Sequence, residues 1–122
     1  MDDRISTGKR GEEIALRHLE KNGYHILERR FRTRFGEIDL IADEGGDLVF
    51  VEVKTRTGPL FGSPEEAVDQ RKQRRLIRLA SAYLQKRRWE DRSCRFDVVA
   101  VVLIPGEREQ IRLFRDAVSV GT

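Results

Sequence analysis

The chain has 122 residues, of which 39% are hydrophobic and 37% are charged, and its formal net charge is +3. These values are typical of one small α/β domain with a single core, and the longest apolar run, residues 98–104, is too short to span a bilayer. The single cysteine, Cys94, excludes an internal disulfide and a cysteine-based zinc cluster, and the polar first residues favour a cytoplasmic protein over an exported one.

The first predicted element is a helix that begins after Ser6 or Thr7 as its N-cap and stops at Gly23. Helical spacing places Glu12 on the apolar side of this helix and Glu13 about a quarter-turn away, toward solvent. A carboxylate at the position of Glu12 either complements the helix dipole or reaches across to the sheet. The spacing alone favours a structural role.

A strongly basic strand follows, over about residues 24–31. Its arginines and those just after it are Arg29, Arg30, Arg32 and Arg34. Two interpretations stand side by side: a solvated edge strand whose charge prevents aggregation, or a surface that contacts phosphates.

Residues 36–41 and 48–54 alternate apolar and polar side chains on either side of a Gly-Gly-Asp turn, which predicts a β-hairpin. Side chains two apart on a strand share a face. We therefore expect Glu37, Asp39 and Ile41 on one face of the first strand, and Ile38 and Leu40 on the other.

On the second strand of this hairpin Phe50, Glu52 and Lys54 share a face. If the two polar faces coincide, Asp39 converges with Glu52 and Lys54. One interpretation is a salt-bridged edge in which Lys54 neutralises the carboxylates. The other is a hard-cation site, where two carboxylates hold Mg²⁺ or Mn²⁺ and the lysine lies beside a reacting phosphate.

A loop with two glycines and two prolines, residues 55–64, leads to a second helix, expected over about residues 64–88 with Ser63 as its cap. Its predicted core face is Leu76, Ala80, Tyr83 and Leu84, with Ile77 beside it. Between residues 71 and 92 there are nine Lys or Arg and only two acids. Such a basic stripe indicates phosphate binding, with a protein partner as the alternative. The arginines opposite the core are Arg71, Arg74, Arg75 and Arg78.

Two more strands close the chain. Residues 95–103 predict a buried, central strand, and the apolar residues between 111 and 114 predict a last one. The expected order is αβββαββ, a mixed β-sheet flanked by helices.

Four blocks of this sequence resemble the bacterial YraN family, which is described as endonuclease-like. They are GKRGE (residues 8–12), GEIDLI (36–41), VFVEVKTR (49–56) and RFDVV (95–99), so the resemblance covers residues 8–103. The spacing of Asp39 from Glu52-Val53-Lys54 is similar to the PD-(D/E)XK nuclease superfamily, which includes archaeal Holliday-junction resolvases. One departure is Ile38, which replaces the proline before Asp39.

The resemblance implies one restriction-endonuclease-like domain over residues 1–122 and metal-dependent hydrolysis of phosphodiester bonds in DNA, branched or single-stranded. It implies that Mg²⁺ or Mn²⁺ is held by Glu12, Asp39, Glu52 and the carbonyl of Val53, with Asp39, Glu52 and Lys54 catalytic. Glu37 is a second-tier candidate for a second metal or an arginine. Nucleic-acid contacts are expected from Arg56, Gln70, Arg71, Lys72, Arg75 and Arg78. A homodimer follows by analogy with the resolvases.

Two other classes of function remain open. A nucleic-acid-binding accessory module would keep the fold and the charge without cutting. A protein-interaction adaptor would use the basic helix to bind an acidic protein. The survival of Asp39, Glu52 and Lys54 favours the enzyme.

Overall fold

The computed structural model describes residues 3–57 and 70–118. Its elements confirm the expected order αβββαββ. In chain order they are α1 (Asp3–Lys21), β1 (His25–Thr33), β2 (Gly36–Glu44), β3 (Asp47–Arg56), α2 (Gln70–Arg87), β4 (Cys94–Val102) and β5 (Gln110–Val118).

The five strands form one mixed sheet in the order β1-β2-β3-β4-β5. The pair β3–β4 is parallel and the other three pairs are antiparallel. The connection between the two parallel strands contains α2, as parallel pairs require a crossover. The predicted hairpin is therefore β2–β3. The expectation that residues 95–103 form the central strand needs a correction: β4 is an inner strand, but the middle of the sheet is β3, because β5 alone lies outside β4.

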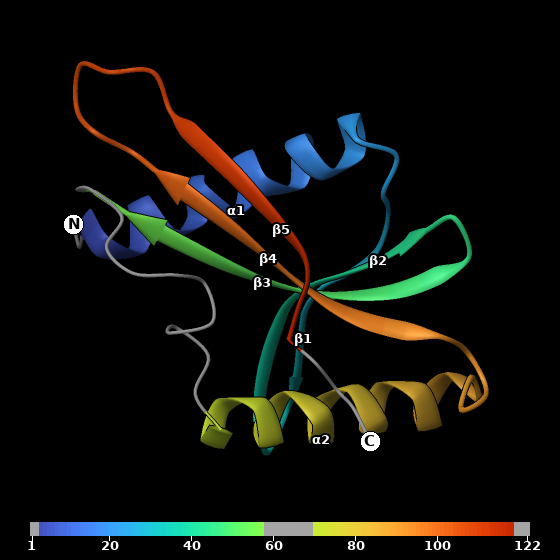
Figure 1. Cartoon of the computed structure of the whole chain (residues 1–122). Coiled ribbons are helices and arrows are strands. Elements are labelled where there is room, and N and C mark those ends of the chain that lie inside the picture. The colour runs from blue at the N-terminus through green and yellow to red at the C-terminus, as the bar shows by residue number, and fades with distance from the viewer. Residues whose placement is uncertain (1–2, 58–69, 119–122) are drawn as a thin grey trace.

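One helix covers each face of the sheet (Figure 1). The core on the α1 side contains Ala15 and Leu19 of the helix with Leu40 and Val51 of the sheet. The core on the α2 side gathers Leu76, Leu79 and Tyr83 around the sheet residues Phe31, Ile38, Phe50 and Phe96. This two-faced burial makes β3 and β4 apolar runs. The mixed sheet with a helix on each face and this element order confirm the α/β class predicted from the sequence.

The predicted start of the first helix is wrong. The helix begins at Asp3, so Ser6 and Thr7 lie inside it. The predicted stop is confirmed: Gly23 has a φ of +88°, and the amide of Tyr24 donates to the carbonyl of Leu19 at 3.0 Å.

The core face of α2 differs from the prediction at two positions. Leu79, absent from the predicted set, is fully buried, whereas Ile77 is 37% exposed. Residues 76, 79, 80 and 83 form the apolar stripe at helical spacing, and position 77 falls about 100° away from it. The predicted helix residues 64–69 and the cap Ser63 lie outside the described residues. Neither α1 nor α2 is long and apolar enough to cross a membrane.

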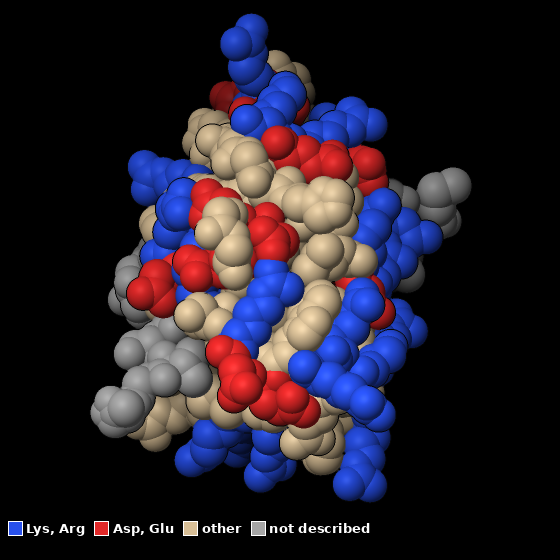
Figure 2. Space-filling model, turned by 90° about the vertical axis from the view of Figure 1, so that its right-hand side faces the viewer, with Lys and Arg blue, Asp and Glu red and all other residues tan. Residues whose placement is uncertain are grey.

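A network around Arg95 ties together the end of the sheet near the β2–β3 turn. The guanidinium donates to Asp97 at 3.1 Å and to Glu44 at 2.5 Å. It also contacts the hydroxyl of Tyr24, which donates to the buried Asp97 at 2.7 Å. Figure 2 views this side of the molecule, where acidic and basic side chains are interleaved. Because Arg95 of β4 also donates to Asp47 of β3, the network ties β2, β3 and β4 together at this end of the sheet.

Candidate functional site

The site begins where β2 and β3 separate. Their ladder runs from the Glu44–Asp47 pair only as far as the pair of Leu40 with Val51. Beyond this point β2 stays paired with β1, and β3 stays paired with β4 as far as Arg56. The two strands therefore form a fork, which opens away from the Arg95 network.

Asp39 occupies the point of the fork. Its Oδ2 accepts a hydrogen bond of 2.8 Å from the amide of Val53, so a side chain replaces the next backbone partner of β3. The N–H and C=O groups of one strand residue point to the same edge. The carbonyl of Val53, predicted as a metal ligand, consequently faces the same gap.

The predicted pleat of β2 is wrong at this position. Ile38 packs in the core on the α2 side and Leu40 in the core on the α1 side, although they were expected to share a face. In the ladder between β1 and β2, the residues on either side of Asp39 are paired, but Asp39 is not paired with Arg30. Arg30 also has a positive φ of +53°. This irregularity interrupts the alternation and frees the Asp39 side chain to turn into the fork.

Three carboxylates meet at the fork. Oxygens of Glu12, Glu37 and Asp39 lie within 4.8 Å of one another, and all three residues are half-buried. We call these residues the acidic trio. The side chain of Glu12 is 18% exposed and that of Glu13 is 43% exposed, so the spacing correctly turned Glu12 inward. Glu37, a second-tier candidate from the sequence, belongs to this group.

Gly11 explains how Glu12 reaches the sheet. A Cβ atom built on Gly11 would lie 2.0 Å from Oγ1 of Thr55 on β3 and 2.9 Å from its Cβ. Any side chain here would collide with a stiff, β-branched residue. A glycine therefore lets α1 approach the sheet one residue before the glutamate that joins the trio.

Electrostatic repulsion accumulates at Asp39. Burial, the charge of Glu52, and the charges of Glu12 and Glu37 together raise the pKa of Asp39 to about 7, against the hydrogen bond from Val53, which lowers it. A divalent cation would relieve this repulsion, and an all-oxygen set of ligands suits Mg²⁺ or Mn²⁺. The residues present thus fit a hard cation.

The basic strand β1 lies at the edge of the sheet, as one of the two interpretations predicted. Its arginines are partly engaged by carboxylates. Arg30 pairs with Glu12 at 3.0 Å, and Arg32 pairs with Glu37 at 2.8 Å. These two ion pairs balance part of the negative charge of the trio.

Glu52 lies on the α2 side of the fork, between two lysines. Its Oε1 is 2.7 Å from Nζ of Lys72 and 3.6 Å from Nζ of Lys54. Burial and the neighbouring Lys72 lower the pKa of Lys54. The sequence predicted that Asp39, Glu52 and Lys54 converge. In the structure Glu52 contacts Lys54 directly, whereas it affects Asp39 through its charge, which raises the pKa of Asp39. Lys72, expected to contact phosphate, is in this structure a partner of Glu52.

The remaining predicted nucleic-acid contacts fall in two places. Arg56 is exposed at the end of β3, where its guanidinium donates to the carbonyl of Thr55. The others lie on the exposed side of α2, whose described residues contain seven Lys or Arg and no acid. They are Gln70, Arg71, Arg75 and Arg78. Blue side chains project from the lower edge of Figure 2, where α2 lies.

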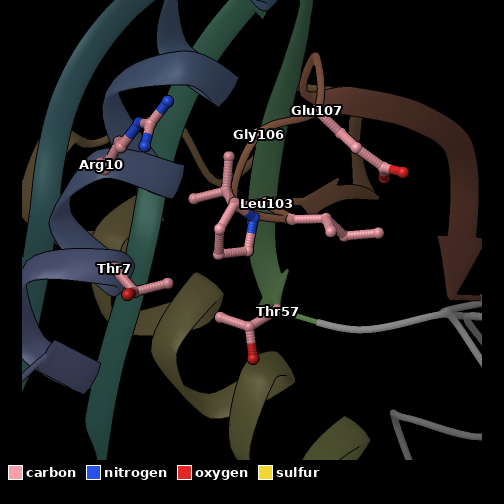
Figure 3. Close-up of a pocket in the computed structure, with 8 residues that line it drawn as sticks. Thr7, Arg10, Thr57, Leu103, Gly106 and Glu107 are labelled. Atoms are coloured by element: carbon pink, nitrogen blue, oxygen red, sulfur yellow. The ribbon is translucent and has the colours of Figure 1, made fainter.

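A pocket of about 350 Å³ lies between α1, the residue after β3 and the β4–β5 connection. Figure 3 shows Thr7 and Arg10 of α1 on one side of it, with Thr57 after β3 and Glu107 in the β4–β5 connection on the others. No predicted site residue lines this pocket. The pocket therefore does not coincide with the predicted site residues.

Comparison with known proteins places this chain in a family. A family model described as "Uncharacterised protein family UPF0102" matches residues 11–101. A UPF0102 protein of Symbiobacterium thermophilum is 54% identical over 90% of this chain and 93% of its own length. One of Syntrophus aciditrophicus is 48% identical over 96% of this chain and 91% of its own.

Among solved structures, a match is the Archaeoglobus fulgidus Hjc, a Holliday junction resolvase, with a TM-score of 0.46 and 18% identity over 85% of this chain and 74% of that chain. The family model covers most of the chain, and the relatives match it over nearly their whole length. The chain therefore belongs to the UPF0102 family, the YraN family that its sequence blocks indicated.

Proposed function

We propose that this protein is a divalent-metal-dependent endonuclease that hydrolyses phosphodiester bonds, with DNA as the expected substrate. The acidic trio carries the proposal. Three carboxylates lie within 4.8 Å of one another, half-buried at an opening of the sheet, and their charges help to raise the pKa of Asp39 to about 7, so a bound cation would relieve a repulsion that the arginine partners only partly balance.

In this proposal Glu12, Glu37 and Asp39 hold Mg²⁺ or Mn²⁺, and the carbonyl of Val53 faces the same gap. Glu52, predicted from the sequence as a further ligand, is not part of this group of three; its Oε1 pairs with Lys54 and Lys72. When bound, such a cation polarises a phosphate and lowers the pKa of a coordinated water.

The lysines would supply the rest of the chemistry. Lys54 and Lys72 place two ammonium groups beside Glu52, where they would stabilise the negative charge on the phosphoryl oxygens during hydrolysis. The lowered pKa of Lys54 brings its amine closer to exchanging a proton with water at neutral pH. Glu52 holds both lysines in position.

A second candidate function has its own supporting observation. Apart from Asp39, each carboxylate near the fork already has a basic partner: Arg30 for Glu12, Arg32 for Glu37 and the two lysines for Glu52. A charge-balanced cluster of this kind can stand without a metal. It would suit a nucleic-acid-binding module that does not cut.

Cleavage assays separate the two candidates. Branched, flapped, duplex and single-stranded DNA would be incubated with wild type, Asp39→Asn, Glu52→Ala and the control Glu13→Gln, with Mg²⁺, Mn²⁺ or EDTA. We expect metal-dependent cleavage of at least one substrate, lost in the first two variants and retained in the control. If the wild type binds these substrates and cuts none of them with either metal, the binding module is the correct function.

A further inference from the structure

The turn between β1 and β2 presents an exposed aromatic ring. Phe35 is 39% exposed, and among the described side chains the other large exposed apolar residue is Ile77. In Figure 1 this turn reaches alongside α2. A single exposed apolar residue needs no explanation by itself, so the surroundings of the ring decide its meaning.

The turn is held firmly against the helix. The amide of Phe35 donates to Oγ1 of Thr33 at 3.0 Å, which closes the turn. Gly36 has a φ of +134°, and a Cβ atom built on it would lie 3.2 Å from Cδ of Arg75. A glycine here permits both the backbone conformation and the close approach to α2. The ring is thus presented from a fixed position.

Arginines surround this ring. The guanidinium carbons of Arg34 and Arg78 lie 5.0 and 5.8 Å from the ring centroid. Phe35 also lines an open hollow of about 220 Å³ together with four arginines of α2. We call these residues the Phe35 patch: Arg34, Phe35, Arg71, Arg74, Arg75 and Arg78. Within the part of the chain that the structure describes, none of its arginines pairs with a carboxylate.

The patch adjoins the acidic trio. Phe35 lies in the turn just before β2, two residues ahead of Glu37 of the trio. Arg75 lies near enough to Lys72 for the two like charges to oppose each other. A nucleotide chain that crosses the fork would therefore meet the patch beside the trio.

We propose that the Phe35 patch binds an unpaired nucleotide of the substrate, with the base stacked on the Phe35 ring and the flanking phosphates on the arginines. The proposal rests on the proposed function and names its substrate class: nucleic acid with a single-stranded stretch beside the bond to be cut. Arginines alone would suit a duplex backbone. The ring adds what a duplex cannot use, because paired bases have no free face, whereas an unpaired base stacks on an aromatic side chain.

Binding measurements in EDTA test this without any cleavage. The probes are a fluorescent 12-nucleotide oligothymidylate and an abasic oligomer of equal length, which keeps the phosphates and lacks the bases. We expect Phe35→Leu to weaken binding of the oligothymidylate about tenfold and to leave binding of the abasic oligomer unchanged. Phe35→Tyr should restore the preference for bases, and Ile77→Ala, at the other exposed apolar side chain, should leave both affinities unaltered.

The outcomes also separate this inference from the proposed function. Equal loss on both oligomers, or no loss on either, overturns the stacking site, provided that each variant keeps the wild-type melting temperature. Wild-type protein that binds neither oligomer overturns it as well. Cleavage of duplex or branched DNA by that same protein would still leave the endonuclease standing. Conversely, a base-dependent affinity that needs Phe35, in a protein that cuts nothing, supports the patch and rejects the endonuclease.

Discussion

The raised pKa of Asp39 predicts that the folded protein loses stability as the pH rises. The ordinary pKa of this carboxyl is 3.8, and in the folded chain it is about 7. Between these values the native state keeps a proton that the unfolded state has released, so the free energy of unfolding falls with increasing pH. One pKa unit corresponds to about 1.4 kcal/mol, which gives a loss of about 4 kcal/mol at most between pH 4 and pH 8.

The variant Asp39→Asn removes this titration and keeps an oxygen that accepts the hydrogen bond from Val53. We expect the variant to be more stable than wild type at pH 8 by up to about 4 kcal/mol, with the difference fading as the pH falls to 4. Mg²⁺ should stabilise the wild type at pH 8 and have little effect on the variant, because only the ionised site binds the cation.

Urea unfolding at pH 4, 6 and 8, with and without Mg²⁺, measures both effects. Glu13→Gln serves as the control, since it removes a carboxylate that is 43% exposed and outside the trio. Its stability should follow that of the wild type at every pH. The reasoning fails if Asp39→Asn keeps a constant difference from wild type across this range, because no proton would then be taken up on folding at this carboxyl.

Three further predictions concern the surroundings of the trio. Glu12→Gln should weaken Mn²⁺ binding in calorimetry more than Glu13→Gln does, and equal effects would remove Glu12 from the ligands. Gly11→Ala should destabilise the fold by about 1–3 kcal/mol, because the added methyl group collides with Thr55. In chemical denaturation, adding Thr55→Ala should recover part of this loss, and strictly additive losses would contradict the close approach of α1 to β3. Arg95→Ala should cost about 3–5 kcal/mol, because it removes the cation from a buried carboxylate, and a melting temperature within a few degrees of wild type would show that the network is not stabilising.

The elements were accessible from the sequence because their signals are local. Alternating strands, the Gly-Gly turn and the stop at Gly23 each depend on a few neighbouring residues. The predictions failed where a local rule met a tertiary contact. Strict alternation put Ile38 and Leu40 on one face, but an irregularity opposite Arg30 places them in different cores.

The site was predictable only in part for the same reason. Spacing brought Asp39 toward Glu52, and helical periodicity turned Glu12 inward, since both depend on regular geometry. Lys72 of α2 pairs with Glu52 of β3. The two residues belong to different elements that are far apart in the sequence, so no periodicity predicts their contact. Phe35 could not be singled out from the sequence, because one exposed apolar residue is ordinary and the arginines around its ring come in part from α2, far along the chain.

The fork explains why the candidate site takes groups from both faces of the sheet. A continuous ladder of strands separates the two layers, so a carboxylate on α1 and a lysine on α2 could not ordinarily reach one phosphate. Here the ladder between β2 and β3 ends at Leu40, and the Asp39 side chain takes the next backbone partner. Glu12 approaches this gap from the α1 side, and Lys72, through Glu52, approaches from the α2 side. We infer that the loss of backbone pairing at Asp39 is what allows cation ligands and lysines to act on the same bond. Under the proposed function, restoring regular pairing there should abolish metal-dependent DNA cleavage even if every charged group were kept.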